Sequence, residues 1–235
     1  MSAVMQEKAG TPRQPTPTAA AAALALPSLN GAALALGTLA LSLATFMNVL
    51  DTSIANVAIP AIAGDLGVSP DQGTWVITSF AVANAISMPL TGWLTRRIGQ
   101  VRLFIASTLL FVVASFLCGL APSLSMLVAF RALQGAVAGP MIPLSQALLL
   151  SSWPKAKAGG ALAVWSMTTL VAPVVGPVLG GWITDNISWP WIFYINVPIG
   201  IAAAIVTWLI YRRRETPTAR LPIDKVGLGL LILWV

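Results

Sequence analysis

Six long stretches with almost no charged side chain constrain this chain more than any other feature of its sequence. Each covers roughly 20 residues or more, the length at which an apolar helix crosses the core of a bilayer. A soluble domain has about 25% charged residues, whereas this chain has 9% and is 57% hydrophobic. The sequence therefore predicts an all-α membrane protein, with spans over residues 33–61, 74–95, 103–121, 124–151, 159–184 and 189–211.

The segments outside this six-helix unit complete the predicted organisation. Residues 1–32 are rich in Ala, Pro and Thr, which is typical of disorder, and we expect a cytoplasmic tail there. Residues 212–225 are predicted to form a cytoplasmic loop. Residues 226–235, VGLGLLILWV, begin a seventh span. Because ten helical residues reach only about 15 Å, half of a bilayer core, we expect the chain to stop inside this element.

The basic residues lie on one side of the predicted spans. Of the 13 Lys and Arg residues, all except Arg131 fall in the amino-terminal tail or in loops on that side. Loops on the opposite side carry Asp65, Asp71 and Asp185 and no basic residue. Basic loops remain in the cytoplasm, so the amino terminus is predicted to be cytoplasmic. A net charge of +6 is also typical of proteins that bind nucleic acid. Here the basic residues lie in short loops between apolar spans, which favours a membrane protein that does not bind nucleic acid.

The chain has one cysteine, Cys118, and no histidine. A single cysteine forms no intrachain disulfide, and no cluster of metal-ligating residues is visible, so we expect neither a metal site nor a cofactor. The absence of histidine makes an intramembrane enzyme the weakest alternative. Carboxylates are left as the side chains that titrate readily near neutral pH.

Asp51 and Arg131 are the two charged residues inside predicted spans. Each costs about 2.5–3.5 kcal/mol at the centre of a membrane helix on insertion scales, so each needs a physical reason. Counted from the outer ends of their spans, Asp51 lies about 13 Å deep and Arg131 about 10 Å deep. The two can therefore interact if the first and fourth spans are neighbours.

Asp51 belongs to a helix face of small and polar residues. Ala44, Asn48, Asp51 and Ala55 recur at spacings of four, three and four residues, which places them on one face. We expect this face to turn toward a bundle interior or a water-filled cavity. Burial disfavours the charged form of an acid and a nearby cation favours it. Asp51 is therefore the candidate proton carrier, and a purely structural ion pair is the alternative; for Arg131 the sequence leaves open tuning of the acid, substrate contact or bonds to backbone carbonyls.

The fifth span contains MTTLVAPVVGPVLGGWI, in which Pro173 and Pro177 are four residues apart, as are Gly176 and Gly180. Proline removes a helical hydrogen bond and bends the helix, while glycine lets a second helix approach closely. The fourth span shows the same pattern in RALQGAVAGPMIPLSQ. Two such spans are more typical of a transporter that moves than of a static anchor.

Some polar and aromatic side chains inside the spans are candidates for lining a substrate cavity, with ordinary helix packing as the alternative for each: Asn48, Asn84, Gln134, Gln146 and Trp165. The loop GWLTRRIGQVRLF after the second span is predicted to be a tight cytoplasmic turn, and its candidate residues are Gly92, Arg96, Arg97, Gly99 and Arg102.

Four segments together resemble the major facilitator superfamily, and specifically its EmrB/QacA branch of drug:proton antiporters. LDTSIANVAIP resembles the first-span motif of that branch, and GWLTRRIGQVRLF the loop motif after the second span. FRALQGAVAGP is similar to the fourth-span motif and APVVGPVLGGW to the antiporter motif of the fifth span. One position departs from the pattern, because Arg96 stands where the loop motif usually has an aspartate.

The resemblance implies a fold, an activity and roles for particular residues. The fold would be the amino-terminal six-helix bundle of the superfamily plus the start of a seventh helix, with the carboxyl-terminal half missing. The activity would be proton-driven export of small hydrophobic drugs across the bacterial inner membrane, without a cofactor and together with a periplasmic adaptor and an outer-membrane channel. Asp51 would carry the proton with Arg131 and Gln134 as its coupled site. The hinge would comprise Gly176, Pro177, Gly180 and Gly181, within an antiporter motif that also includes Pro173.

Two alternatives to a drug exporter stay open at this point. One is a solute transporter of another direction or substrate, from which the segment APVVGPVLGGW distinguishes a drug antiporter. The other is a truncated membrane protein that does not transport by itself, because alternating access needs two halves that move against each other.

Overall fold

The computed structural model describes residues 28–219, 227 and 229. Most of the predicted tail, residues 220–225 of the predicted loop, and the predicted seventh span apart from residues 227 and 229 lie outside this part of the chain. Within it, every regular element is helical.

Six helical segments of the described chain are long and apolar enough to cross a membrane, which confirms the predicted fold class. The first is the single helix α2 (Gly31–Asp65), and the third is α6 (Gln100–Gly119). The others are each built from consecutive shorter elements. These are α3 (Pro70–Gly73), α4 (Trp75–Ser87), η1 (Met88–Leu90) and α5 (Thr91–Ile98) for the second; α7 (Leu124–Ala138) and α8 (Met141–Ser152) for the fourth; η2 (Lys155–Lys157) and α9 (Ala158–Asn186) for the fifth; and α10 (Trp191–Tyr194) and α11 (Asn196–Tyr211) for the sixth.

The ends of the observed spans differ from the predicted ends by about one helical turn at most. Helix α2, for example, has 35 residues and continues past Pro60 to Asp65. Gly67 then takes a positive φ of 66°, a conformation that ends the helix and that glycine adopts without steric cost. The predicted span ends where the apolar run ends, because only that part of the helix lies inside the bilayer. The helix itself continues until a residue such as Gly67 stops it.

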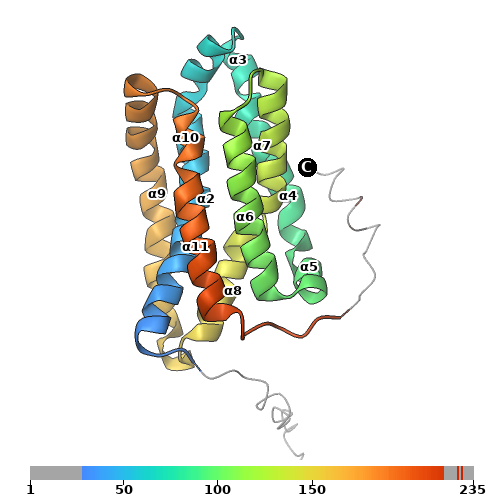
Figure 1. The fold of residues 1–235 in the computed structure, drawn as a ribbon, viewed down its shortest axis with the longest axis vertical. Coiled ribbons are helices and arrows are strands. Elements are labelled where there is room, and N and C mark those ends of the chain that lie inside the picture. Colours follow the sequence, from blue (N-terminus) through green and yellow to red (C-terminus); the bar gives the residue numbers. More distant parts are fainter. Residues whose placement is uncertain (1–27, 220–226, 228, 230–235) are drawn as a thin grey trace, which may run out of the picture.

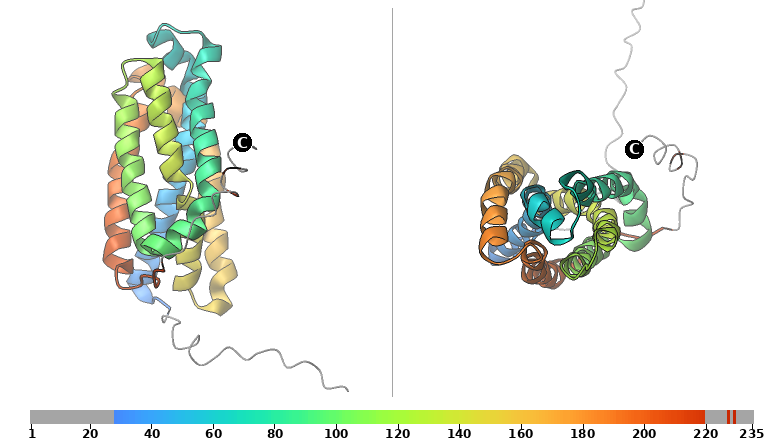
Figure 2. Two further views of the ribbon diagram at one scale, coloured as in Figure 1. Left: turned by 90° about the vertical axis from the view of Figure 1, so that its right-hand side faces the viewer. Right: turned by 90° about the horizontal axis from the view of Figure 1, so that it is seen from above.

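The helices stand side by side along one axis, so that successive connections fall at opposite ends of the bundle (Figures 1 and 2). One end holds α3 and the α9–α10 connection, with the exposed acids Asp65, Asp71 and Asp185. The other end holds α5, the α8–α9 connection and the end of α11. Its exposed basic residues are Arg96, Arg97, Arg102, Lys155, Lys157, Arg212 and Arg213. The described part of the chain thus has the charge asymmetry that the sequence predicts.

Helix α2 lies in the interior of the bundle and packs against α9, α11, α8 and α4. The four residues of its predicted polar face are all buried: Ala44, Asn48, Asp51 and Ala55. By contrast, α9 turns an apolar face outward, where Leu170, Val174 and Val178 are at least 70% exposed. Such a face suits contact with lipid or with other helices.

Helices α4 and α7 pack with their backbones close together because α7 has glycines at the contact. A Cβ atom added to Gly135 would overlap the backbone of Phe80, and one added to Gly139 would overlap Ser87. This close packing brings α4 directly beside Arg131, which lies one turn before Gly135 on the same helix.

Candidate functional site

Asp51 of α2 and Arg131 of α7 form an ion pair in the interior of the bundle. Arg131 Nη1 donates to Asp51 Oδ2 over 2.5 Å, and the two side chains are 0% and 1% exposed. Removing two charges from water is costly, and the cost is recovered only with good geometry and further hydrogen bonds. The structure therefore brings together the two charges that the sequence places at similar depth.

Further donors satisfy the carboxylate of Asp51. Gln134 Nε2 donates to Oδ1 over 3.2 Å, and Asn196 Nδ2 of α11 donates to the same oxygen over 2.8 Å. Gln134 Oε1 in turn accepts from Arg131 Nη1 over 2.7 Å. The acid thus has three donors from two other helices, and Gln134 bridges the pair that it was predicted to accompany.

Asn196 extends this network to α6. Its Nδ2 also donates to Ser115 Oγ over 3.0 Å, and Ser115 Oγ–H donates to the carbonyl of Phe193 over 2.9 Å. Asn196 Oδ1 is buried without a partner among the described residues. Our reading of the sequence missed Asn196 and Ser115. For Asn196 the available signal was an amide within the otherwise apolar segment WIFYINVPIGI.

Arg131 is held by α4 as well as by Asp51. Its Nε donates to the carbonyl of Val76 over 3.1 Å. The guanidinium carbon lies 4.3 Å from the centre of the Phe80 ring and 5.6 Å from that of Phe193, positions in which aromatic faces attract a cation. Nη2 has no acceptor among the described residues. Of the roles left open for Arg131, backbone bonding and pairing with the acid are both observed.

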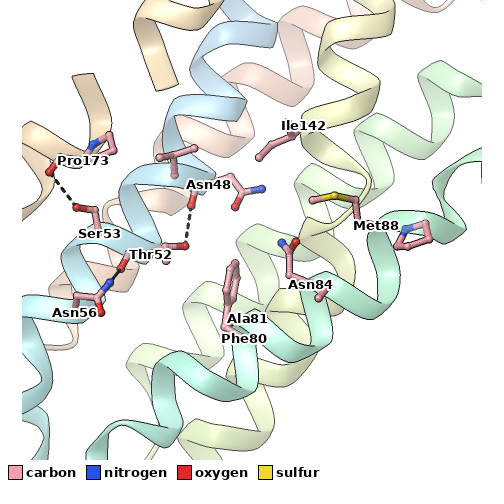
Figure 3. A pocket seen from close by; sticks show the side chains of 13 residues that line it. Asn48, Thr52, Ser53, Asn56, Phe80, Ala81, Asn84, Met88, Ile142 and Pro173 are labelled. Carbon is pink, nitrogen blue, oxygen red and sulfur yellow. Dashed lines mark hydrogen bonds between the residues drawn. The ribbon is translucent and has the colours of Figure 1, made fainter. Parts of the chain in front are cut away.

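A cavity of about 720 Å³ opens between α2 and α4 (Figure 3), and its lining includes Phe80, whose ring contacts Arg131. Its volume lies in the range of sites that hold drug-sized ligands. Asn48, Thr52, Ser53 and Asn56 come from α2, and the remaining lining residues are Val49, Phe80, Ala81, Asn84, Ala85, Met88, Pro89, Ile142 and Pro173. The polar groups of this lining are amides and hydroxyls, so the cavity wall offers hydrogen bonds without a charge.

The predicted cavity residues divide into two groups. Asn48 and Asn84 line the cavity, whereas Gln134, Gln146 and Trp165 do not. Trp165 is instead 5% exposed in the hydrophobic core, where its Nε1 donates to Ser145 Oγ over 3.1 Å. Gln134 belongs to the ion-pair network, and Gln146 is half-buried on α8. In this structure these three side chains therefore lie outside the cavity lining.

The predicted hinge residues of α9 point in different directions. Gly176 and Gly180 face α2, where a Cβ atom would meet Ser53 and Ile54. Because Pro177 has no N–H, the carbonyl of Pro173 has no helical donor, and Ser53 Oγ–H donates to it over 3.3 Å. Pro173 also lines the cavity. A Cβ atom added to Gly181 would have no heavy atom within 4 Å, so this glycine is not at a helix contact.

The predicted turn around Arg96 and Arg97 connects α5 to α6 and is held by the segment after α11. Gly99 ends α5 with a φ of 99°, a conformation that favours glycine. Glu215 accepts from the backbone N–H groups of Val101 and Arg102 over 3.0 and 2.9 Å. A carboxylate at the start of a helix is stabilised by the helix dipole.

Two further contacts complete this connection. Thr216 Oγ1 accepts from Gln100 N over 3.1 Å, and the carbonyl of Arg96 accepts from Ala219 N over 2.7 Å. Arg96 and Arg97 themselves are exposed, and Gly92 has open space around it. Our reading of the sequence missed Glu215, although an acid inside the basic run RRRETP was a visible signal.

Comparison with known proteins gives matches over most of the chain. The family description "Major Facilitator Superfamily" matches residues 41–234. The chain is 66% identical over 209 residues to "Multidrug export protein EmrB" of Haemophilus influenzae, covering 89% of this chain and 41% of that protein. It is 61% identical over 209 residues to "Fatty acid resistance protein FarB" of Neisseria gonorrhoeae, with the same two shares covered. The chain thus spans about two fifths of the curated relatives that it matches.

Solved structures share its fold. A peptide transporter POT in complex with alafosfalin matches with a TM-score of 0.68 at 14% identity, over 84% of this chain and 44% of that one. A bacterial homologue of the human lysosomal transporter Spinster, inward-facing and unoccupied, matches with a TM-score of 0.63 at 21% identity, over 86% of this chain and 47% of that one. These matches confirm the predicted resemblance in fold, and they are to transporters rather than to enzymes.

Proposed function

The chain belongs to the major facilitator superfamily, and from this premise we propose that it forms the amino-terminal half of a proton-driven multidrug efflux antiporter. Asp51 is the acid that takes up and releases the proton, and Arg131 with Gln134 is its coupled site. The observation that carries the proposal is the buried Asp51–Arg131 ion pair, which lies beside a cavity of drug size.

The ion pair supplies a switch between two states. A proton on Asp51 removes its negative charge, so the attraction that holds Arg131 Nη1 at Asp51 Oδ2 is lost. A buried cation without its partner is strongly destabilised, which favours a second arrangement of the helices around it. Substrate binding that prefers one of the two arrangements is then coupled to proton uptake. In this scheme the inward-facing and outward-facing states exchange drug and proton in turn.

The cavity supports small hydrophobic drugs as substrates. Its lining is mainly apolar, and Asn48, Asn56 and Asn84 add neutral hydrogen-bonding groups. The names of the relatives refer to multidrug export and to fatty acid resistance, and fatty acids are largely apolar molecules. No cofactor enters this scheme, because the proton gradient supplies the energy.

The proposal includes a location and partners. The exposed basic end of the bundle faces the cytoplasm of a bacterial inner membrane, with the amino terminus on that side. A second half, corresponding to the part of the longer relatives that this chain does not cover, would complete the transport path. A periplasmic adaptor and an outer-membrane channel would carry the drug onward, by analogy with the family resemblance alone. A solute transporter of another direction or substrate remains the competing function.

The test uses this chain joined to the remainder of the Haemophilus influenzae relative and reconstituted in proteoliposomes. We expect an imposed pH gradient to drive drug uptake in this protein and Asp51→Asn to abolish the proton dependence. Asp185→Asn is the matched control, because Asp185 is an exposed acid at the end of α9. Gradient-driven export that persists with unchanged proton coupling in Asp51→Asn would refute the assigned role. Residues 1–235 expressed alone are expected to give cells no drug resistance.

A further inference from the structure

We infer that Phe80 couples the drug cavity to the proton site: its ring separates the two and is the contact through which an occupied cavity acts on Arg131. This inference rests on the proposed function and deepens it by naming the residue that connects its two sites. Neither Asp51 nor Arg131 lines the cavity, whereas Phe80 does. Phe80 is nevertheless only 4% exposed, because α4 and α7 enclose it.

The position of the ring gives it both neighbours. Figure 3 shows the side chain of Phe80 pointing from α4 into the space between α4 and α2, beside Asn84. The guanidinium of Arg131 lies over the same ring, 4.3 Å from its centre. A ligand that enters between α2 and α4 therefore meets the ring that touches Arg131.

The electrostatics of Arg131 make this contact more than packing. Nε and Nη1 have oxygen acceptors, but Nη2 has none among the described residues, although the side chain is fully buried. A buried cationic N–H without an acceptor is costly. The negative π face of an aromatic ring attracts a cation, and of the two rings beside the guanidinium that of Phe80 is the nearer, at 4.3 Å against 5.6 Å for Phe193. A displaced ring would therefore weaken the position of Arg131 and, through it, the hold on Asp51.

Helix α4 adds a second link at the same place. Val76, one turn before Phe80, accepts from Arg131 Nε through its backbone carbonyl. Gly135 packs directly on the backbone of Phe80, so α4 and α7 are in close contact at this residue. Rotation of the Phe80 side chain or movement of α4 is the motion by which the cavity reaches the ion pair.

The first experiment measures proton flux in proteoliposomes of the joined protein, with and without drug. In Phe80→Ala we expect drug-independent proton flux to rise at least about tenfold, which corresponds to about 1.4 kcal/mol, and the added flux to vanish in the double variant with Asp51→Asn. Phe80→Leu keeps an apolar side chain but lacks the π face. We expect it to keep the drug-free flux low and to reduce drug-stimulated exchange about tenfold. Trifluorophenylalanine at position 80, which keeps the ring shape and weakens its π face, should reduce that exchange in the same direction.

The second experiment needs no transport and uses residues 1–235 in lipid nanodiscs. Hydrogen exchange at Arg131 Nε is expected to accelerate at least about tenfold in Phe80→Ala because the wall over a buried group is removed. Phe116→Ala is the control, since Phe116 is 47% exposed on α6 and does not line the cavity; it should leave the exchange rate unchanged.

The outcomes separate this inference from the proposed function. If Phe80→Ala and Phe80→Leu behave like the unaltered protein while Asp51→Asn abolishes coupling, Phe80 is not the link and the proposed function stands. If Asp51→Asn retains coupling with Phe80 in place, the proposed function itself is wrong. Equal exchange rates at Arg131 Nε in Phe80→Ala and Phe116→Ala would also overturn the inference.

Discussion

The side-chain amide of Asn196 donates to the carboxylate of Asp51 over 2.8 Å, although the two residues are 145 positions apart in the chain. Through this bond α11 reaches the acid of α2, and Arg131 and Gln134 of α7 reach it from another helix. Three helices therefore meet at one buried carboxylate. A change in its charge alters contacts with each of them at once.

Asn196→Leu is expected to lower the free energy of unfolding by about 1.5–3 kcal/mol, the range for a hydrogen bond to a charged group. Leucine has a similar size but cannot donate to Asp51 or Ser115. Thermal unfolding in detergent measures the loss. Asn186→Leu is the control, because Asn186 is exposed and bonds only within α9, to the carbonyl of Trp182. Equal losses in the two variants would show that the bond to Asp51 adds no stability.

The buried pair is expected to behave as one unit in a double-mutant cycle. Arg131→Met or Asp51→Asn alone leaves a buried polar or charged group without its partner, and the expected cost is about 3–5 kcal/mol. The double variant should cost less than the sum of the two single variants. The comparison pair is Arg102 and Glu215, whose ion pair is 3.9 Å long with Arg102 75% exposed, and whose coupling should be near zero. Additive losses at Asp51 and Arg131 would contradict the predicted coupling.

Alanine at two glycines of α9 is expected to have opposite effects. In Gly176→Ala the new Cβ meets the side chain of Ser53, and overpacking of this kind costs about 1–3 kcal/mol. Gly181→Ala meets nothing within 4 Å, so the higher helix propensity of alanine should stabilise the protein by up to about 1 kcal/mol. Drug export by the joined protein should fall in Gly176→Ala and persist in Gly181→Ala. Export that survives unchanged in Gly176→Ala would argue against an antiporter motif at this contact.

Glu215→Gln is expected to loosen the first turn of α6. The carboxylate accepts from the N–H groups of Val101 and Arg102, and loss of a helix-capping charge costs about 0.5–2 kcal/mol. Amide hydrogen exchange at residues 100–102 should therefore accelerate in this variant. Arg102→Gln should leave the exchange of Val101 unchanged, because the exposed ion pair contributes little. Slow exchange in Glu215→Gln would mean that Gly99 and Thr216 hold this turn without the acid.

Much of the fold could be predicted because it depends on local properties of the sequence. Apolar length fixes the six spans, and the alternation of basic and acidic loops is carried by residues such as Arg96 and Asp65. The depth of Asp51 and of Arg131 also follows from counting residues along a helix. Their contact does not follow from it, because one sequence does not state which helices are neighbours.

The remaining part of the site depends on side-chain direction within the assembled bundle. Trp165 and Asn84 are both plausible cavity residues by type, yet one lies in the core and the other lines the cavity. Successive residues of a helix are rotated by about 100°, so a small change in helix orientation decides whether a side chain lies in the core or lines the cavity. The sequence of α9 is apolar on nearly all sides and therefore does not specify which face is inward. Phe80 carries no sequence signal at all, since a phenylalanine in a membrane helix is ordinary.

The bond between Arg131 Nε and Val76 has a consequence for genetics. Its acceptor is a main-chain oxygen, which every amino acid supplies, proline included. Codon changes at position 76 therefore cannot delete this acceptor, and a saturation library would report the position as tolerant wherever the replacement still packs. The contribution of this carbonyl would become visible through insertions or deletions that shift the register of α4.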